Sequence, residues 1–251
     1  MYSVYALKFA EQDVASCEFF YRERSHDPVT LNFFVWLILG GPKPILVDTG
    51  FSEFDASERE LRNFVPPAEM VRRAGVDPVE IELTVMTHLH WDHWAGHRQF
   101  TNSRFVVQSR EVAFWTGRFG SNPVFGRGIN VEELAHLVPL TYGGRVDVID
   151  GDLELLPGIR LYRLGGHTEG TQVVVVDTET GPLVLAADAS HFFRNVETGH
   201  PVQIASNLTD MLAGFDRMKR LAGTTGTIVA GHDPEIAERF KVQEQGIIQL
   251  A

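Results

Sequence analysis

The sequence predicts an α/β fold, because short apolar runs typical of strands each end in polar residues. The run at 83–87 is rich in β-branched side chains and precedes a stretch that could begin a helix. Residues 158–163, 182–187 and 227–231 have the same strand-like character. Since α/β sheets place binding sites where strands give way to loops, the polar residues after these runs are the candidates for function.

The densest cluster of such residues is the hexad His-Leu-His-Trp-Asp-His at 88–93, which holds four strong metal ligands. Imidazole and carboxylate groups suit zinc and neighbouring divalent metals. A short loop cannot move its ligands far apart, so two adjacent metals are expected. One would be bound by His88 and His90, and the other by Asp92 and His93. Each metal then needs further ligands from elsewhere in the chain.

Three residues in the second half of the sequence can supply them. His167 follows the run at 158–163, Asp188 ends the run at 182–187, and His232 follows the run at 227–231. Each therefore lies at the predicted end of a strand, as the hexad does.

The order and spacing of these motifs resemble the metallo-β-lactamase fold over nearly the whole chain. The motifs are Pro44–Gly50, the hexad, Gly166–Thr168, Asp188 and Gly231–Asp233. The resemblance implies an α/β architecture of two αββα halves, a four-layer αββα sandwich with the metals at one edge. We expect residues 1–251 to form a single domain of this kind.

The resemblance also implies the ligands of two divalent ions, which it assigns to seven residues. The first metal would be held by His88, His90 and His167, the second by Asp92, His93 and His232, with Asp188 bridging them. Zinc is preferred on ligand type, while iron, cobalt or manganese would fit the same set. Asp48 and Asp233 are candidates to accept an imidazole N–H from a ligand, and Asp233 could equally cap a helix.

Composition restricts the class of protein. The net charge of −11 argues against a nucleic-acid substrate, which needs a basic surface. The longest apolar run, 33–39, is too short to span a membrane, and residues 1–12 lack the pattern of a signal peptide. A cytoplasmic protein without a membrane partner is therefore expected. Cys17 is the only cysteine, which excludes an internal disulfide, and we expect it to pack as a small apolar residue.

Within the superfamily, the closest resemblance is to the N-acyl-homoserine lactone lactonases. This chain has their short tail, with 19 residues after His232, and their motif Asp188-Ala189-Ser190. The tail is too short for the helical domain of glyoxalase II-like thioesterases, and Asp188 stands where the commoner zinc β-lactamases have cysteine. The next position departs from the family pattern, because His191 stands where those lactonases usually have tyrosine. His191 can still donate a hydrogen bond to a carbonyl or oxyanion.

The expected function is metal-dependent hydrolysis of a lactone, by attack of a hydroxide that bridges the two metals. His191 would share the oxyanion's charge, and Asp92 would pass a proton to the leaving alkoxide or act only as a ligand. Two alternatives remain: hydrolysis of a linear ester, thioester, amide or β-lactam by the same site, and a metal-binding protein without turnover.

Aromatic residues suggest an apolar pocket for the rest of the substrate. Trp91, between two ligands, is the best candidate to lie near the metals, whereas Trp115, on a helix expected to begin near Ser109, is assigned to the core. Residues 116–130 are predicted to form a mobile loop that could cover the site. The aromatic-rich N-terminal segment would suit a homodimer. Four histidines outside the motifs are predicted not to bind metal: His26, His97, His136 and His200.

Overall fold

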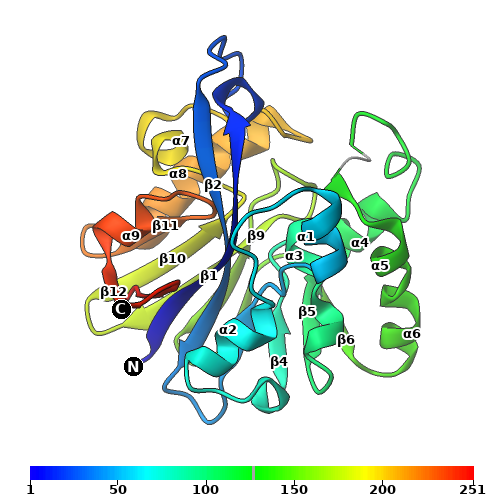
Figure 1. The fold of residues 1–251 in the computed structure, drawn as a ribbon, viewed down its shortest axis with the longest axis vertical. Coiled ribbons are helices and arrows are strands. Elements are labelled where there is room, and N and C mark those ends of the chain that lie inside the picture. The colour runs from blue at the N-terminus through cyan, green and yellow to red at the C-terminus, as the bar shows by residue number, and fades with distance from the viewer. Residues whose placement is uncertain (126–127) are drawn as a thin grey trace.

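The computed structural model describes residues 1–125 and 128–251, which form two sheets packed face to face (Figure 1). The strands of the first sheet are β1 (Ser3–Ala15), β2 (Pro28–Leu39), β3 (Ile45–Val47), β4 (Leu83–Val85), β5 (Arg104–Gln108), β6 (Val146–Ile149), β12 (Lys241–Glu244) and β13 (Ile247–Gln249). Those of the second are β7 (Leu153–Leu156), β8 (Ile159–Arg163), β9 (Gln172–Thr178), β10 (Gly181–Ala187) and β11 (Thr227–Ala230). Their spatial orders are β12-β13-β1-β2-β3-β4-β5-β6 and β11-β10-β9-β8-β7.

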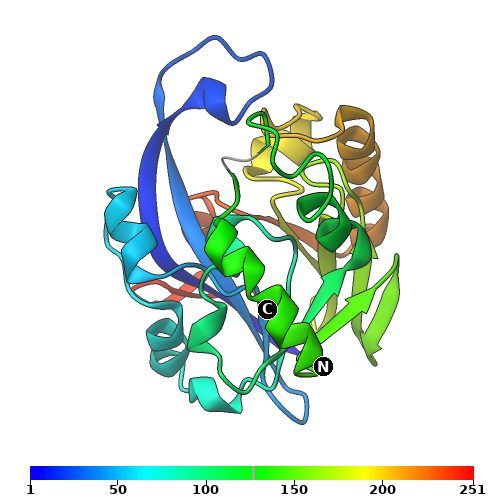
Figure 2. The ribbon, with the colours of Figure 1, turned by 90° about the vertical axis from the view of Figure 1, so that its right-hand side faces the viewer.

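Helices cover the outer face of each sheet. Those on the side of the first sheet are α1 (Glu53–Glu58), α2 (Pro67–Arg73), α3 (Trp91–Trp94), α4 (Ser109–Trp115), α5 (Val131–Ala135) and α6 (Leu137–Tyr142). Those on the side of the second are α7 (Phe193–Thr198), α8 (Leu208–Ala222) and α9 (Ile236–Arg239). Figure 2 shows the layers, with α1 and α2 in cyan outside the blue strands and α8 in orange outside the yellow-green strands. The predicted αββα sandwich is therefore confirmed.

Alternation along the strands explains why each sheet is covered on both faces. In β2, Trp36 points into the core between the sheets, whereas Val35 and Leu37 point outward against α2. In β9, Val174 lies in the inter-sheet core and Val175 packs beneath α8. Strands buried on both faces read as continuous apolar runs, which is why these segments show no polar face in the sequence.

The predicted strand at 83–87 is two residues too long, since β4 ends at Val85. Thr87 instead donates its backbone N–H to Asp48 Oδ1 at 2.7 Å, so a side chain replaces a strand partner there. The other strand predictions agree with the structure to within one residue, and a helix does begin at Ser109. Within the described ranges, no helix is long and apolar enough to cross a membrane.

Candidate metal centre

Parallel strand pairs bring the predicted ligands to one edge of the sandwich. β3 and β4 are parallel, so Asp48 and His88, which follow them, lie side by side. β10 and β11 are also parallel, which places Asp188 beside His232. The expectation that the whole hexad lies on a loop is wrong in part. His88 and His90 precede α3, whereas Asp92 and His93 lie within this short helix.

The first group of potential ligands comprises His88, His90, His167 and Asp188, with ligand atoms all within 4.8 Å of one another. His167 Nε2 lies 2.8 Å from His90 Nδ1 and 3.2 Å from Asp188 Oδ2. His88 Nε2 lies 3.7 Å from the same carboxylate oxygen. Two imidazole nitrogens therefore face one oxygen of Asp188, and the His90 nitrogen lies against one of them.

The second group comprises Asp92, His93, His232 and again Asp188, also within 4.8 Å. Here the convergence is on the other oxygen, because Asp188 Oδ1 lies 2.9 Å from His232 Nε2 and 3.1 Å from His93 Nε2. Asp92 Oδ2 lies 3.5 Å from His93 Nε2 and 3.7 Å from His232 Nε2. The structure thus brings together all seven residues named from the sequence, with Asp188 between the groups.

The donor set fits two divalent ions. His88 Nε2 and His93 Nε2 are buried and have no hydrogen-bond partner among the described residues, although each faces the centre of its group. A buried polar nitrogen without a partner costs about 1 to 3 kcal/mol, so these positions call for an electrophile. Zinc and similar ions accept imidazole nitrogen and carboxylate oxygen together.

Hydrogen bonds to the far side of the rings fix their orientation. His167 Nδ1 donates to the carbonyl of Ile204 and His232 Nδ1 to that of Asn32, both at 2.9 Å, which leaves each Nε2 free for a metal. His93 Nδ1 is 2.7 Å from Asp48 Oδ2. The bracing role expected for Asp48 is therefore confirmed.

The two groups differ in their electrostatics. Burial lowers the pKa values of His88 and His90 well below the usual range, so these rings are neutral. Burial alone would lower the pKa values of His93 and His232, but the neighbouring carboxylates of Asp188 and Asp92 together raise both. Burial would raise the pKa of Asp92, but the neighbouring His93 lowers it to about 2.

Backbone strain occurs beside two of these carboxylates. Asp48 has a φ of 60° and Ala187, directly before Asp188, a φ of 43°, in the left-handed region that side chains disfavour. Such strain persists only where surrounding contacts impose it, and it clusters at functional sites.

His191 lies against both groups. Its Nε2 is 3.0 Å from Asp188 Oδ2, and its ring stacks on His232 with 5.3 Å between centroids. Burial lowers the pKa of His191 to about 4, so the ring is neutral with one N–H. Its buried Nδ1 has no hydrogen-bond partner among the described residues. Phe19, 5.3 Å away between ring centroids, forms an apolar wall beside it.

Trp91, expected near the metals, belongs to an aromatic group that reaches a predicted ligand. It packs against Phe33 and Phe51, with the Arg59 guanidinium 3.8 Å from its ring centre, and Phe33 in turn contacts the ring of His232. One aromatic ring therefore lies between Trp91 and this ligand.

Two further expectations need correction. Of the two roles left open for Asp233, the acceptance of an imidazole N–H is not found among the described residues, because its oxygens accept the backbone N–H groups of Phe193 and of Glu235, the residue before α9. Cys17 is partly exposed rather than packed as an apolar residue, and its Sγ lies 3.5 Å from His26 Nδ1.

Sequence reasoning missed two residues that contact the ligand loops. Glu111, on α4, accepts a hydrogen bond from the backbone of Leu89 between two ligands. Gly128 lies so close to His90 that a Cβ there would meet the ring at 2.5 Å. The glycine content of 116–130 was a signal for the second, but Glu111 belongs to no motif. Residues 126 and 127 of that predicted covering loop lie outside the described residues.

His97, Glu133 and His136 form another group with metal-ligand chemistry. Arg98 Nη2 lies 2.7 Å from His136 Nε2, His136 Nδ1 lies 3.4 Å from His97 Nε2, and His97 Nδ1 lies 3.1 Å from the carbonyl of Trp94. Because arginine only donates, the protons run in one direction along this chain and every ring nitrogen is engaged. The hydrogen bonds of the two histidines are therefore explained without a metal.

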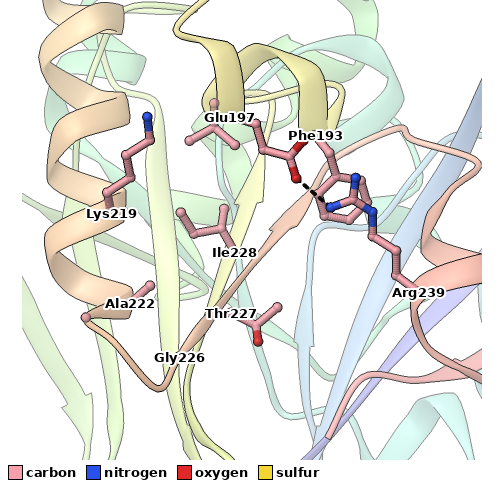
Figure 3. A pocket seen from close by; sticks show the side chains of 10 residues that line it. Phe193, Glu197, Lys219, Ala222, Gly226, Thr227, Ile228 and Arg239 are labelled. Atoms are coloured by element: carbon pink, nitrogen blue, oxygen red, sulfur yellow. Dashed lines mark hydrogen bonds and ion pairs between the residues drawn. The ribbon is translucent and has the colours of Figure 1, made fainter.

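A cavity of about 370 Å³ lies between α7, α8 and β11, away from the metal ligands (Figure 3). Arg239 lies over the Phe193 ring and pairs with Glu197 and Glu235, so its charge is already neutralised. Lys219 extends from α8 at the rim. None of the seven predicted ligands lines this cavity, and we take the seven-residue centre as the candidate active site.

Comparison with known proteins agrees with this geometry. A family model described as the Metallo-beta-lactamase superfamily matches residues 33–232, so the chain belongs to that superfamily. Its relatives there include an N-acyl homoserine lactonase of Bacillus sp, which is 31% identical over 219 residues covering 79% of this chain and 80% of that protein. The N-acyl homoserine lactonase AiiA of Bacillus thuringiensis subsp. kurstaki is 29% identical over 242 residues, covering 84% and 86%. The resemblance predicted from the motifs is confirmed.

Solved structures show the same fold. A quorum-quenching N-acyl homoserine lactone lactonase superposes with a TM-score of 0.80 at 24% identity, covering 96% of each chain. An N-acyl homoserine lactone hydrolase with the product N-hexanoyl-L-homoserine at its catalytic metal center gives 0.81 at 23% identity, covering 96% of this chain and 97% of the other.

Proposed function

We propose that this protein is a dinuclear metal-dependent hydrolase that opens the ring of an N-acyl homoserine lactone or a related lactone. The observation that carries the proposal is the pair of ligand groups that share Asp188, one on each carboxylate oxygen. The relatives named N-acyl homoserine lactonases, which match about four fifths of the chain, support this substrate class.

His88, His90 and His167 would hold the first ion, Asp92, His93 and His232 the second, and Asp188 both. We propose zinc for both positions on ligand type. Two divalent ions in such a site polarise an ester carbonyl and lower the pKa of water to roughly 7. The chain itself then has to orient the lactone, stabilise developing negative charge and deliver a proton.

His191 is the proposed donor to the substrate oxygen. A neutral ring has a single N–H, and the contact of Nε2 with Asp188 shows that this edge faces the ligand cluster. A lactone carbonyl that becomes an oxyanion would accept this N–H in competition with Asp188. The wall formed by Phe19 excludes water on one side, which strengthens such a hydrogen bond.

Asp92 is the proposed proton carrier. Its side chain is 12% exposed against 4% for Asp188, so it lies nearer to solvent and to an entering substrate. A pKa of about 2 means that it is ionised and free to accept a proton, though it is a weak base. It would accept a proton from the attacking water and donate it to the alkoxide that leaves as the ring opens.

Acid release from a panel of lactones, followed by pH-stat titration on zinc-reconstituted protein, tests the proposal. The panel contains long- and short-chain acyl homoserine lactones, simple γ- and δ-lactones, and linear esters of equal acyl length. We expect chelator-sensitive turnover that favours one lactone class. Faster turnover of the linear esters would assign the site to the alternative ester hydrolase. No turnover with two metals bound would contradict the proposal.

A further inference from the structure

Glu111 is a fully buried carboxylate on the first turn of α4, and it makes contacts that the proposed chemistry does not use. Burying a charge is costly unless several donors compensate it. Glu111 has four. Its Oε1 accepts the backbone N–H of Leu89 at 2.9 Å and Trp115 Nε1 at 2.6 Å. Its Oε2 accepts Thr168 Oγ1 at 2.6 Å and the backbone N–H of Gly170 at 2.9 Å.

These donors belong to both loops that form the first ligand group. Leu89 stands between His88 and His90, and Thr168 directly follows His167. One carboxylate therefore ties the hexad loop to the His167 loop, which are about eighty residues apart in the sequence and belong to different sheets. None of the four donors adjoins a ligand of the second group.

The contact with the His167 loop is close enough to require glycine. A Cβ at Gly170 would lie 2.4 Å from both the backbone nitrogen and the Cβ of Glu111. Such an approach places the Gly170 N–H in reach of the carboxylate and fixes the distance between α4 and this loop.

The fourth donor, Trp115, connects Glu111 to an aromatic ring that packs on a predicted ligand. Its ring lies 5.4 Å from that of His90 between centroids, and its Nε1 is held by Glu111 one turn earlier on α4. The carboxylate thus fixes both the backbone beside His90 and the ring that packs on it.

We propose that Glu111 is the positioning residue of the first metal, which holds His90 and His167 at the separation that one ion requires. The proposal rests on the metal centre of the proposed function but needs no substrate. Four donors and no acceptor face the carboxylate, so its partners match the ionised form, although burial raises the pKa of Glu111. An amide at this position would turn its own N–H group toward at least one of the donors.

Glu111→Gln tests the proposal through metal binding rather than activity. Zinc affinity is measured by competition with a chromophoric chelator in two backgrounds, His232→Ala, which leaves the first group intact, and His167→Ala, which leaves the second intact. We expect Glu111→Gln to weaken zinc binding about 10- to 100-fold in the first background and to leave the second unchanged. The cobalt absorption bands of the first group should shift in parallel.

Asp55→Asn is the matched control, because Asp55 is also a buried helix carboxylate but contacts only Ser52 and Asn130. It should lower thermal stability without changing zinc affinity in either background. Thr168→Val, which removes one of the four donors, should give a smaller loss in the first background only. If Glu111→Gln does not fold, the zinc affinities of Thr168→Val in the two backgrounds test the proposal in its place.

Equal loss in both backgrounds, or no loss with either variant, would overturn the proposal. These outcomes are independent of the lactone assay, so a failure of the proposed function and a failure of this proposal are distinguishable.

Discussion

The two ligand groups meet at Asp188 yet are built by different means. In the first, burial keeps the rings of His88 and His90 neutral, and the two ligand loops are tied through backbone N–H groups to Glu111. The second includes the carboxylate of Asp92, and Asp48 contacts the ring of His93 itself. Thus the carboxylate that supports the first group contacts its loops, whereas the one that supports the second contacts a ligand ring. Only this contact with a ring also adds to the raised pKa of a ligand, that of His93.

Loss of the residue common to both groups should have the largest effect. Asp188→Ala removes an oxygen from each group, so we expect zinc content to fall from two ions to fewer than one per chain. Lactone turnover should fall at least about 1000-fold, beyond the ~100- to 1000-fold typical of losing one oxyanion donor. Elemental analysis and kcat/KM measure the two effects. Retention of both ions would show that Asp188 is not shared.

Removal of the Asp48 carboxylate should change the zinc affinities of the two groups to different extents. Asp48→Asn weakens the hydrogen bond that fixes His93, so zinc affinity of the second group should fall about 10- to 100-fold. Because Asp48 also accepts hydrogen bonds from Thr87, directly before His88, we expect a smaller loss at the first group. The matched control is Asp233→Asn, because Asp233 adjoins a ligand but accepts only backbone N–H groups. Chelator competition gives both affinities. An equal loss at both groups would mean that the bracing is not specific.

His191→Phe tests whether His191 contributes to lactone turnover without contributing to the binding of either metal. Loss of its N–H should lower lactone turnover several-fold to about 100-fold, with two ions still bound. His200→Phe is the control, since this ring donates a hydrogen bond to the carbonyl of Tyr21 and contacts no proposed ligand. Turnover and metal content are measured on the same samples. An unchanged rate would remove His191 from the proposed mechanism.

Competition between protons and zinc should give the smallest difference in zinc affinity between the two groups. The pKa of His93 is raised because of Asp188 and Asp92, so in the metal-free protein this ring is protonated near neutral pH and must lose its proton to bind metal. Zinc affinity of the second group should therefore rise with pH, by at most about tenfold per unit, until the raised pKa is passed. The first group, in which burial lowers the pKa values of His88 and His90, should show a flatter profile. Chelator competition between pH 6 and 8 compares them, and equal slopes would contradict the charge difference.

Much of the fold and the candidate site could be predicted from the sequence. The runs that became β8, β10 and β11 are apolar and β-branched, and such local composition is sufficient to indicate buried strands. His167, Asp188 and His232 follow these strands and the hexad follows β4, so pairing of the strands carries all seven proposed ligands to a common edge. Their residue types and positions after predicted strands were enough to propose them.

The contacts that support each ligand group, and the pKa values of its imidazoles, are set only by the tertiary structure. Glu111 has no neighbour in the sequence that reveals its partners, because all but one of its four donors lie on loops brought to it by the packing of the two sheets. The sequence likewise could not show that Trp91 packs on Phe33 and Phe51, which come from distant segments. Local composition determines which segments are strands and which side chains can bind a metal. Orientation, burial and the pKa of each imidazole depend on contacts between distant segments, which exist only once the sandwich has formed.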